Sequence, residues 1–372
     1  MKGILAIVLA VALVGCQPKQ ARREYVFPDF TRVTVDHNDP VARAAQIFFD
    51  EHQGKVEQDA RNSQQDFVPA YSKFAAKVRP YIQLPAGSRD FDRDAALIAN
   101  ATLDRYLTPK GWMFRIADTY ATDAAGQPIV LRVLMIGQLH SVRHANVVDV
   151  HGKTVSYTES IVTEAKQTRA REKSFRFTAF TEDTSIYHFL DGLEWSARRA
   201  VEDCRDGKAE GAEFAQAEWA GEFQVSGATP QFEARVMSDL LHSASAHERQ
   251  HVIDHEFGAL RLVKDDTPVA KVKLIMEIRG LLAQIASGGA EIYGFGHAVE
   301  WSESNDMISR ATGGATITAI GSLPQSGDLR GFLRAKAARE LRVSDELVLA
   351  ALRHKEDPDP VGRAKEEHDK NR

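Results

Sequence analysis

The chain has 372 residues, of which 43% are hydrophobic, 8% aromatic and 27% charged, and it carries a net charge of −5. This is an ordinary globular composition with ample material for a core, and the length suggests about two domains or one large one. A pI near 6.2 excludes the basic field that a nucleic-acid-binding protein would need, so we expect no nucleic-acid partner.

The first residues have the pattern of a signal peptide, expected to span residues 1–15. Lys2 precedes an apolar run, Ile4 to Val14, which is too short to span a bilayer as a mature helix. The sequence Leu13-Val-Gly-Cys16 resembles the lipobox of bacterial lipoproteins, which implies cleavage before Cys16 and lipidation of that cysteine. By the same resemblance, Gln17 implies an outer-membrane lipoprotein that faces the periplasm. The alternative is an ordinary secretory signal or an uncleaved anchor.

After a polar tether at residues 16–23, an α+β region is expected at residues 24–206. Asp39 and Pro40 predict the start of a helix, and helical periodicity returns at 67–78 and 91–107. Branched and apolar residues then predict a small antiparallel sheet, with strands at 129–136, 142–150, 153–163 and 174–181. A helix is expected from Ser185 to Asp206.

The second half is predicted to be helical. Residues 207–228 are expected to form a loop-rich connection, residues 229–354 a helical region, and residues 355–372 a charged, disordered tail. Thr229 and Pro230 predict the start of one helix, which should end at Gly258. A second helix, from Val269 to Ser287, is apolar nearly all round and should be buried.

Weaker patterns follow. A helix containing two glycines is expected at 290–301, a loop or short strand at 311–321, and two amphipathic helices at 329–341 and 344–353. The sequence therefore predicts an α+β fold that is mostly helical, with the antiparallel sheet in the first half.

The motif His247-Glu248-Arg-Gln-His251 lies inside the first helix of the second half. Residues four apart share a helix face and lie about 6 Å apart along the axis, so both imidazoles can converge on one Zn²⁺. Glu248 points to the side of that site, where it could take a proton from a zinc-bound water whose pKa is lowered to about 7. The alternative is a solvated helix face that carries polar residues by chance.

This motif resembles that of the zincin metallopeptidases, and the resemblance covers the motif helix and the helix after it. In gluzincins the third zinc ligand is a glutamate on that next helix, which implies Glu277 here. A carboxylate in a nearly all-apolar helix is costly to bury unless it is paired or bound to metal, which favours the same residue. Gluzincins often carry an aspartate four residues later, where this chain has Leu281. The alternative for Glu277 is a salt bridge, for instance with Lys273 or Arg279.

Other side chains compete for the third ligand position. Glu291 lies in a glycine-rich segment that allows close approach of the backbone, and if it is the ligand, Glu277 is an interhelical partner. His255 lies about 12 Å from His247 along a straight helix, too far to share one ion. Metzincins have a helix-breaking glycine before their third histidine, and this chain lacks one there. His297 could bind the metal or stabilise an oxyanion.

Supporting roles can also be assigned. Asp254 could accept the N–H of a ligating imidazole, or it could be an ordinary residue of the helix surface. Tyr293 and His297 could polarise a tetrahedral intermediate, against the simpler interpretation of a core aromatic and a surface histidine. With Cys16 lipidated, Cys204 is the remaining thiol, and we interpret it as structural.

Together these features predict a lipid-anchored zinc metallohydrolase of the cell envelope, with a peptidase as the main hypothesis and envelope proteins or peptides as substrates. Zinc held by His247, His251 and Glu277 would polarise the scissile carbonyl. Glu248 would deprotonate the attacking water and pass the proton to the leaving amine. The alternative is a non-catalytic envelope lipoprotein, a scaffold or binding protein, with a chance or degenerate H-E-x-x-H.

Overall fold

A computed structural model describes residues 27, 29–58, 63–87, 93–122, 128–148, 152–167, 178–182, 184–207, 212–257, 269–304, 307–324 and 327–355. The chain divides into two units, Met1–Phe30 and Thr31–Arg372, and every helix and strand described below belongs to the second. The predicted signal peptide, Cys16, the tether and the tail beyond Lys355 lie outside the described residues. In the described part of the chain, no helix has the length and apolar character needed to cross a membrane.

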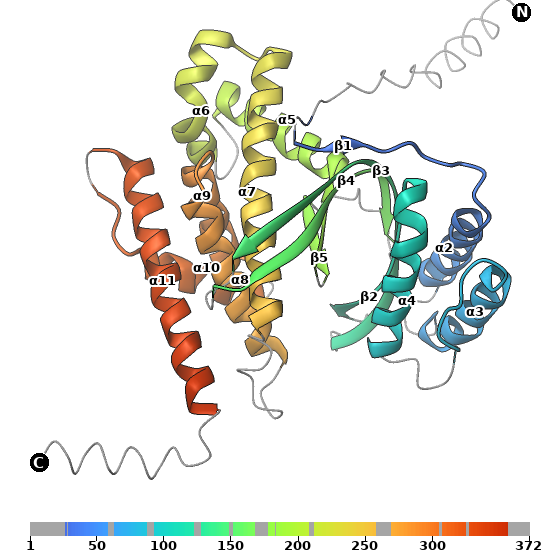
Figure 1. Cartoon of the computed structure of the whole chain (residues 1–372). Coiled ribbons are helices and arrows are strands. Elements are labelled where there is room, and N and C mark those ends of the chain that lie inside the picture. Colours follow the sequence, from blue (N-terminus) through green and yellow to red (C-terminus); the bar gives the residue numbers. More distant parts are fainter. Residues whose placement is uncertain are drawn as a thin grey trace, which may run out of the picture. The chain divides into compact units, whose positions relative to one another are not determined.

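The elements follow the predicted order of a mixed first half and a helical second half (Figure 1). The first half contains β1 (Thr31–Arg32), α2 (Pro40–Gln58), α3 (Ser63–Val78), α4 (Arg93–Leu107), the short 3-10 helix η1 (Thr108–Lys110), β2 (Trp112–Thr122), β3 (Pro128–Val148), β4 (Thr154–Gln167), β5 (Ala179–Glu182) and β6 (Ser185–Phe189). The second half contains α5 (Leu190–Asp206), α6 (Ala212–Ser226), α7 (Pro230–Phe257), α8 (Val269–Ala286), α9 (Glu291–Ser302), α10 (Met307–Ile320) and α11 (Leu329–Lys355). The prediction of an α+β, mostly helical fold is confirmed.

The sheet is mixed rather than wholly antiparallel. Its described strands follow the order β1-β3-β4-β6-β5, with β2 also paired to β3. Every pair is antiparallel except β4 with β6. The two strands expected at 129–136 and 142–150 are one strand, β3. Gly137 in its middle permits a close approach to β4, since a Cβ there would lie 2.4 Å from a methyl group of Val162.

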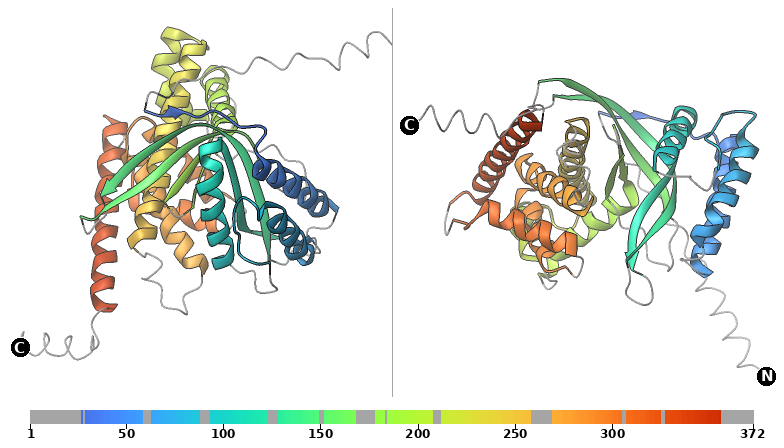
Figure 2. Two further views of the ribbon diagram at one scale, coloured as in Figure 1. Left: turned by 45° about the vertical axis from the view of Figure 1, so that its right-hand side comes forward. Right: turned by 90° about the horizontal axis from the view of Figure 1, so that it is seen from below.

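The two faces of the sheet carry different layers of the core (Figure 2). Phe114 and Ile116 of β2, with Leu134 of β3, pack against aromatic side chains of α2 and α3. Alternate residues, such as Met113 and Met135, turn to the opposite face, as the two-residue period of a strand requires. Val252 of α7 packs on Val155 and Tyr157 of β4 and on Ile186 of β6; Ile186 alternates with Tyr187 and Phe189 of that second layer, so α7 contacts the other face of these strands. The first-half sheet therefore supports the helix that carries the histidine motif.

A buried polar cluster also ties α7 to the sheet. The hydroxyl of Ser245 lies 3.2 Å from Nε2 of His188 in β6 and 3.4 Å from Oε2 of Glu159 in β4. Arg143 of β3 donates to the same carboxylate at 2.5 Å. Burial raises the pKa of Glu159, but hydrogen bonding and charge from His188 and Arg143 outweigh it and lower the pKa to about 2. Ser245, His188 and Glu159 are all buried, so we interpret the cluster as a structural contact that holds α7 against the sheet.

The predicted loop-rich connection at 207–228 is wrong, because α6 occupies most of it. Ala212, Ala215 and Trp219 recur at helical spacing and are buried, and the indole Nε1 of Trp219 donates to Asp239 of α7 at 3.1 Å. The thiol of Cys204 lies 3.4 Å from the Ala215 carbonyl oxygen, and burial raises its pKa to about 11, which fits a structural cysteine.

Other predicted boundaries also differ. Residues 185–189 form β6 before α5 begins, and residues 307–320 form α10 rather than a loop or strand. Gly313 lets α10 contact α9 closely, since a Cβ there would lie 2.3 Å from the Ala298 carbonyl oxygen. The two helices expected at the end are one, α11. Ser344, which has the residue type of an N-cap, instead donates to the Leu341 carbonyl oxygen within the helix at 2.7 Å.

Candidate metal centre

Helix α7 places both motif histidines on one face. Its start is capped as predicted, because the Thr229 hydroxyl oxygen accepts the backbone N–H of Phe232 at 3.2 Å. The helix then runs unbroken to Phe257, so His247 and His251 keep the spacing of one helical turn, and their ring centroids lie 4.7 Å apart. The same continuity keeps the backbone of His255 two helical turns from that of His247.

Glu277 of α8 faces this pair of imidazoles. Its Oε2 lies 3.4 Å from Nε2 of His247 and 3.9 Å from Nε2 of His251. One ligand atom from each of the three residues lies within 4.8 Å of the others. The alternative partner Arg279 binds Asp254 and Asp345 instead. The structure therefore brings together the three side chains that the sequence singled out as metal ligands.

The donor set fits a zinc ion. Two imidazoles and one carboxylate are a common protein ligand set for catalytic zinc, which keeps its fourth position open. Tetrahedral bonds of about 2.05 Å place donor atoms about 3.3 Å apart, close to the distances of Glu277 from the two histidines. The side chains of His247, His251 and Glu277 are 12%, 13% and 21% exposed, so the centre is mostly buried but accessible to solvent.

The neighbours of His247 on α8 were not found from sequence. A Cβ on Gly280 would lie 2.8 Å from Cε1 and Nε2 of His247, so the imidazole occupies space that only glycine leaves open. Burial opposes a charge on His247, but hydrogen bonds to Glu277 and Gln284, with the charges of Glu248 and Glu277, raise its pKa above the ordinary value. The sequence signal for both residues is their helical spacing from Glu277.

Glu248 follows His247 on α7 and is outside the donor set. Its side chain is only 9% exposed. The hydroxyl of Thr181 in β5 donates to its Oε2 at 2.6 Å and lies 3.3 Å from its backbone oxygen. Thr181 was not predicted to have a role, because nothing in the local sequence of a short strand indicates which helix it will contact.

Asp254 does not have the predicted role. One of its carboxylate oxygens accepts from Nε of Arg279 at 2.9 Å and from Nε2 of Gln250 at 2.8 Å. The other is buried without a hydrogen-bond partner among the described residues, so neither contacts an imidazole. Burial raises the pKa of Asp254 to about 6, against the opposing charge of Arg279. The physical reason is that α8 presents a buried guanidinium on this side of α7, and the guanidinium requires a carboxylate.

Glu291 is also not at the centre, which overturns the alternative third ligand. It is buried at the start of α9, where its Oε1 accepts from Nε of Arg334 in α11 at 2.8 Å. The neighbouring backbone N–H groups of Ile292 and Tyr293 donate to the Glu218 carboxylate, at 2.6 and 3.1 Å. These bonds fix the first turn of α9 toward α6 and α11.

The two candidates for oxyanion stabilisation differ in position. Burial is the main cause that lowers the pKa of His297 to about 4, and the charges of His247 and Arg199 act in the same direction. Its ring lies between Tyr293 and Trp301, with centroid distances of 6.2 and 6.0 Å. Tyr293 packs on Trp219 at 5.1 Å, and burial is the main cause that raises its pKa to about 12. Both catalytic roles stay predictions.

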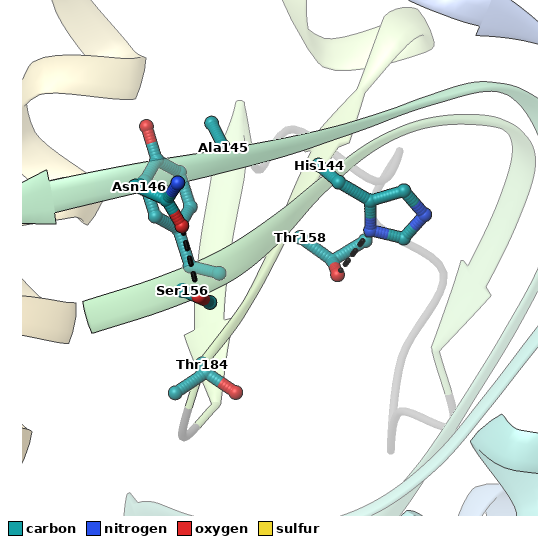
Figure 3. Close-up of a pocket in the computed structure, with 7 residues that line it drawn as sticks. His144, Ala145, Asn146, Ser156, Thr158 and Thr184 are labelled. Carbon is teal, nitrogen blue, oxygen red and sulfur yellow. Dashed lines mark hydrogen bonds between the residues drawn. The ribbon is translucent and has the colours of Figure 1, made fainter. Parts of the chain in front are cut away.

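A shallow pocket of about 230 Å³ lies elsewhere, on β3 and β4 (Figure 3). Its polar side chains already pair with one another across the strands. His144 Nδ1 lies 3.1 Å from the Thr158 hydroxyl, and the Ser156 hydroxyl donates to Asn146 at 2.8 Å. The pocket contains none of the triad residues and adds nothing to the candidate metal centre.

No protein-family model, curated protein or solved structure matches this chain. The functional argument therefore rests on the geometry of the described side chains.

Proposed function

We propose that this chain is a zinc metallohydrolase, and specifically a peptidase that acts on proteins or peptides of the bacterial cell envelope. The observation that carries the proposal is the convergence of His247, His251 and Glu277 from two helices, with Glu248 beside them. If the H-E-x-x-H pattern were a coincidence, there would be no reason for a carboxylate from a second helix to complete a zinc donor set. Zinc, when bound, would lower the pKa of a water molecule and polarise the substrate carbonyl.

The protein groups have separate tasks in this scheme. His247, His251 and Glu277 would hold the ion, with room for water or substrate as a fourth ligand. Glu248 takes a proton from the attacking water and gives it to the leaving amine nitrogen. Because the Thr181 hydroxyl donates to Oε2 of Glu248, that bond fixes the carboxylate and leaves Oε1 to receive the proton. His297 is the candidate to stabilise charge on the carbonyl oxygen.

The test is zinc stoichiometry of the full chain, purified in detergent, for wild type, His251→Ala and Glu248→Gln. We expect about one zinc per chain in wild type, a loss in His251→Ala, and retention in Glu248→Gln because Glu248 is not a ligand. Hydrolysis of fluorescein-labelled casein should disappear in Glu248→Gln. No zinc in wild type after dialysis against added zinc would overturn the proposal and favour the scaffold lipoprotein. Zinc without hydrolysis of any peptide bond would overturn only the peptidase assignment.

We also propose that the chain is anchored by lipid at Cys16 in the outer membrane. The support is the order of a basic residue, an apolar run and Leu13-Val-Gly-Cys16. Mass spectrometry of the mature N-terminus should show an acylated Cys16, and Cys16→Ser should abolish labelling with palmitate. A mature protein that begins elsewhere would refute the anchor without affecting the metal centre.

A further inference from the structure

Helix α8 packs against both α7 and α11, and one side chain of α8 binds to both of them (Figure 1). Arg279 is almost wholly buried, at 2% exposed. Its Nε donates to Oδ1 of Asp254 in α7 at 2.9 Å, and its Nη2 donates to Oδ1 of Asp345 in α11 at 2.6 Å. Its Nη1 donates to the hydroxyl oxygen of Ser344, also in α11. All three guanidinium nitrogens are therefore hydrogen-bonded, and together they link three helices.

This link lies beside the proposed metal ligands on both α7 and α8. Asp254 follows His251 by three residues, so the two side chains share one face of α7. Arg279 follows Glu277 by two residues on α8. Glu277 lies 3.4 and 3.9 Å from the two motif histidines, and the ion pair of Arg279 with Asp254 is the next contact across the same helix interface. Helix α8 therefore cannot slide or turn on α7 without changing both contacts.

The metal centre depends on how these two helices pack. The helical repeat fixes the spacing of the two histidine ligands, but the third ligand, Glu277, comes from α8. Zinc-ligand distances tolerate only about 0.2 Å. Most other side chains of α8 are apolar, and apolar contacts are not directional. A guanidinium bonded to carboxylates has a fixed, planar geometry, so it restricts the packing of the helices more than apolar contacts do.

We propose that Arg279 is a positioning residue of the metal centre, which holds α8 against α7 so that Glu277 meets the two histidines. Asp345 of α11 has a part in this role, because it fixes the orientation of the guanidinium from the side opposite α7. The inference rests on the proposed zinc site. It adds that a carboxylate of α11, which is outside the donor set, controls the affinity of that site for zinc.

The test measures zinc affinity of the full chain by competition with a chromogenic chelator, and stability by chemical unfolding of the zinc-free protein. Asp345→Ala removes the outer partner of Arg279, and we expect zinc to bind about 2- to 30-fold more weakly. Arg279→Lys keeps the charge but replaces three directional donors with one nitrogen, so its zinc affinity should fall at least as far. Both losses should be seen in protein that is fully folded before zinc is added.

Asp104→Ala is the matched control. Asp104 is 23% exposed and binds the buried Arg115, just as Asp345 is 26% exposed and binds the buried Arg279. Arg115 is bound in the first-half core and contacts neither α7 nor α8 through a described hydrogen bond or ion pair. Asp104→Ala should therefore lower the free energy of unfolding and leave zinc affinity unchanged. A purely structural role of Asp345 would give the same result.

The outcomes separate this inference from the proposed function. A wild-type protein that binds no zinc overturns the metal site, and this inference with it. Zinc binding in wild type, with equal affinity in Asp345→Ala or an equal loss in Asp104→Ala, overturns the role of Arg279 and leaves the metal site standing. If Arg279→Lys does not fold, Asp345→Ala decides alone. The Asp345 side chain is 26% exposed, so water can reach the guanidinium in its place and the variant should fold.

Discussion

Gly280→Ala is the change that most directly tests how the centre is assembled. A Cβ at this position would lie 2.8 Å from Cε1 and Nε2 of His247, whereas ordinary van der Waals contacts begin at 3.4 Å. The ring would have to withdraw by 3.4 − 2.8, or about 0.6 Å. Metal-ligand distances tolerate only about 0.2 Å, so the withdrawal should break the coordination geometry. We expect zinc affinity to fall at least about tenfold, the low end for a disturbed ligand.

The assay pairs chelator competition with chemical unfolding of the zinc-free protein. Glycine to alanine inside a helix stabilises by about 0.5–1 kcal/mol where space permits. Gly221→Ala in α6 provides the matched control, because nothing lies within 4 Å of its Cβ, and it should show that gain with normal zinc affinity. Gly280→Ala should gain less stability and lose zinc. Wild-type zinc affinity in Gly280→Ala would refute the conclusion that the His247 ring is held against α8 at Gly280.

Three further predictions concern side chains around the centre. Thr181→Val should reduce the kcat for casein hydrolysis about tenfold, because it removes the hydrogen bond that orients Glu248, and zinc content should not change. Thr181→Ser keeps the hydroxyl and should keep activity. Equal rates in both variants would exclude the orienting bond. Glu291→Gln should weaken the ion pair with the largely exposed Arg334 and lower the free energy of unfolding by about 1 kcal/mol or less, with full zinc stoichiometry. Loss of zinc would instead indicate that Glu291 is a ligand. The pKa of Glu159 is lowered to about 2 in the fold, so its stabilisation is present above pH 4.5 and is lost as the pH falls toward 2, by up to about 3 kcal/mol. Glu159→Gln should remove that part of the acid dependence, and an unchanged acid limb of the unfolding free energy would contradict the assignment.

The histidine pair and Glu277 could be identified from sequence because each depends on a local rule. The spacing of His247 and His251 is set by the helical repeat, and the N-cap at Thr229 fixes where that helix begins. Glu277 stood out because a charged group on a nearly apolar helix needs a partner. The structure gives it the two histidines as neighbours, and its role as a ligand stays a prediction until the metal is measured.

The error at Asp254 shows that local sequence rules do not predict contacts between helices. Its position next to His251 on α7 is predictable, but its partner depends on which side chain α8 presents there. Arg279 was considered only as a partner of Glu277. It binds Asp254 and reaches Ser344 and Asp345 of α11, whose residue types had predicted a helix start. A serine and an aspartate that look like a helix start are therefore used inside a continuous helix, because a buried arginine needs their oxygens.

Strand β6 escaped prediction for a related reason. Ile186, Tyr187 and Phe189 are all buried, and a short apolar run of this kind is typical of a buried strand or of a helix. The parallel pairing with β4 decides between them, and it depends on where the chain returns after β5. Sequence periodicity contains no information on that return, so the mixed sheet could not be distinguished from an antiparallel one.

The register of β5 connects the first half of the chain to the candidate base. Glu182 binds the buried guanidinium of Arg115 at 2.9 Å and accepts from Asn100 at 3.0 Å, while its neighbour Thr181 turns to the other face and donates to Glu248. A slip of one residue would exchange the two side chains. It would place a second carboxylate beside Glu248 and leave Arg115 without one of its acidic partners. Because both errors are costly, the core built by α4 and β2 fixes which oxygen of Glu248 accepts from Thr181, and the other oxygen is the one that receives the proton in the proposed mechanism.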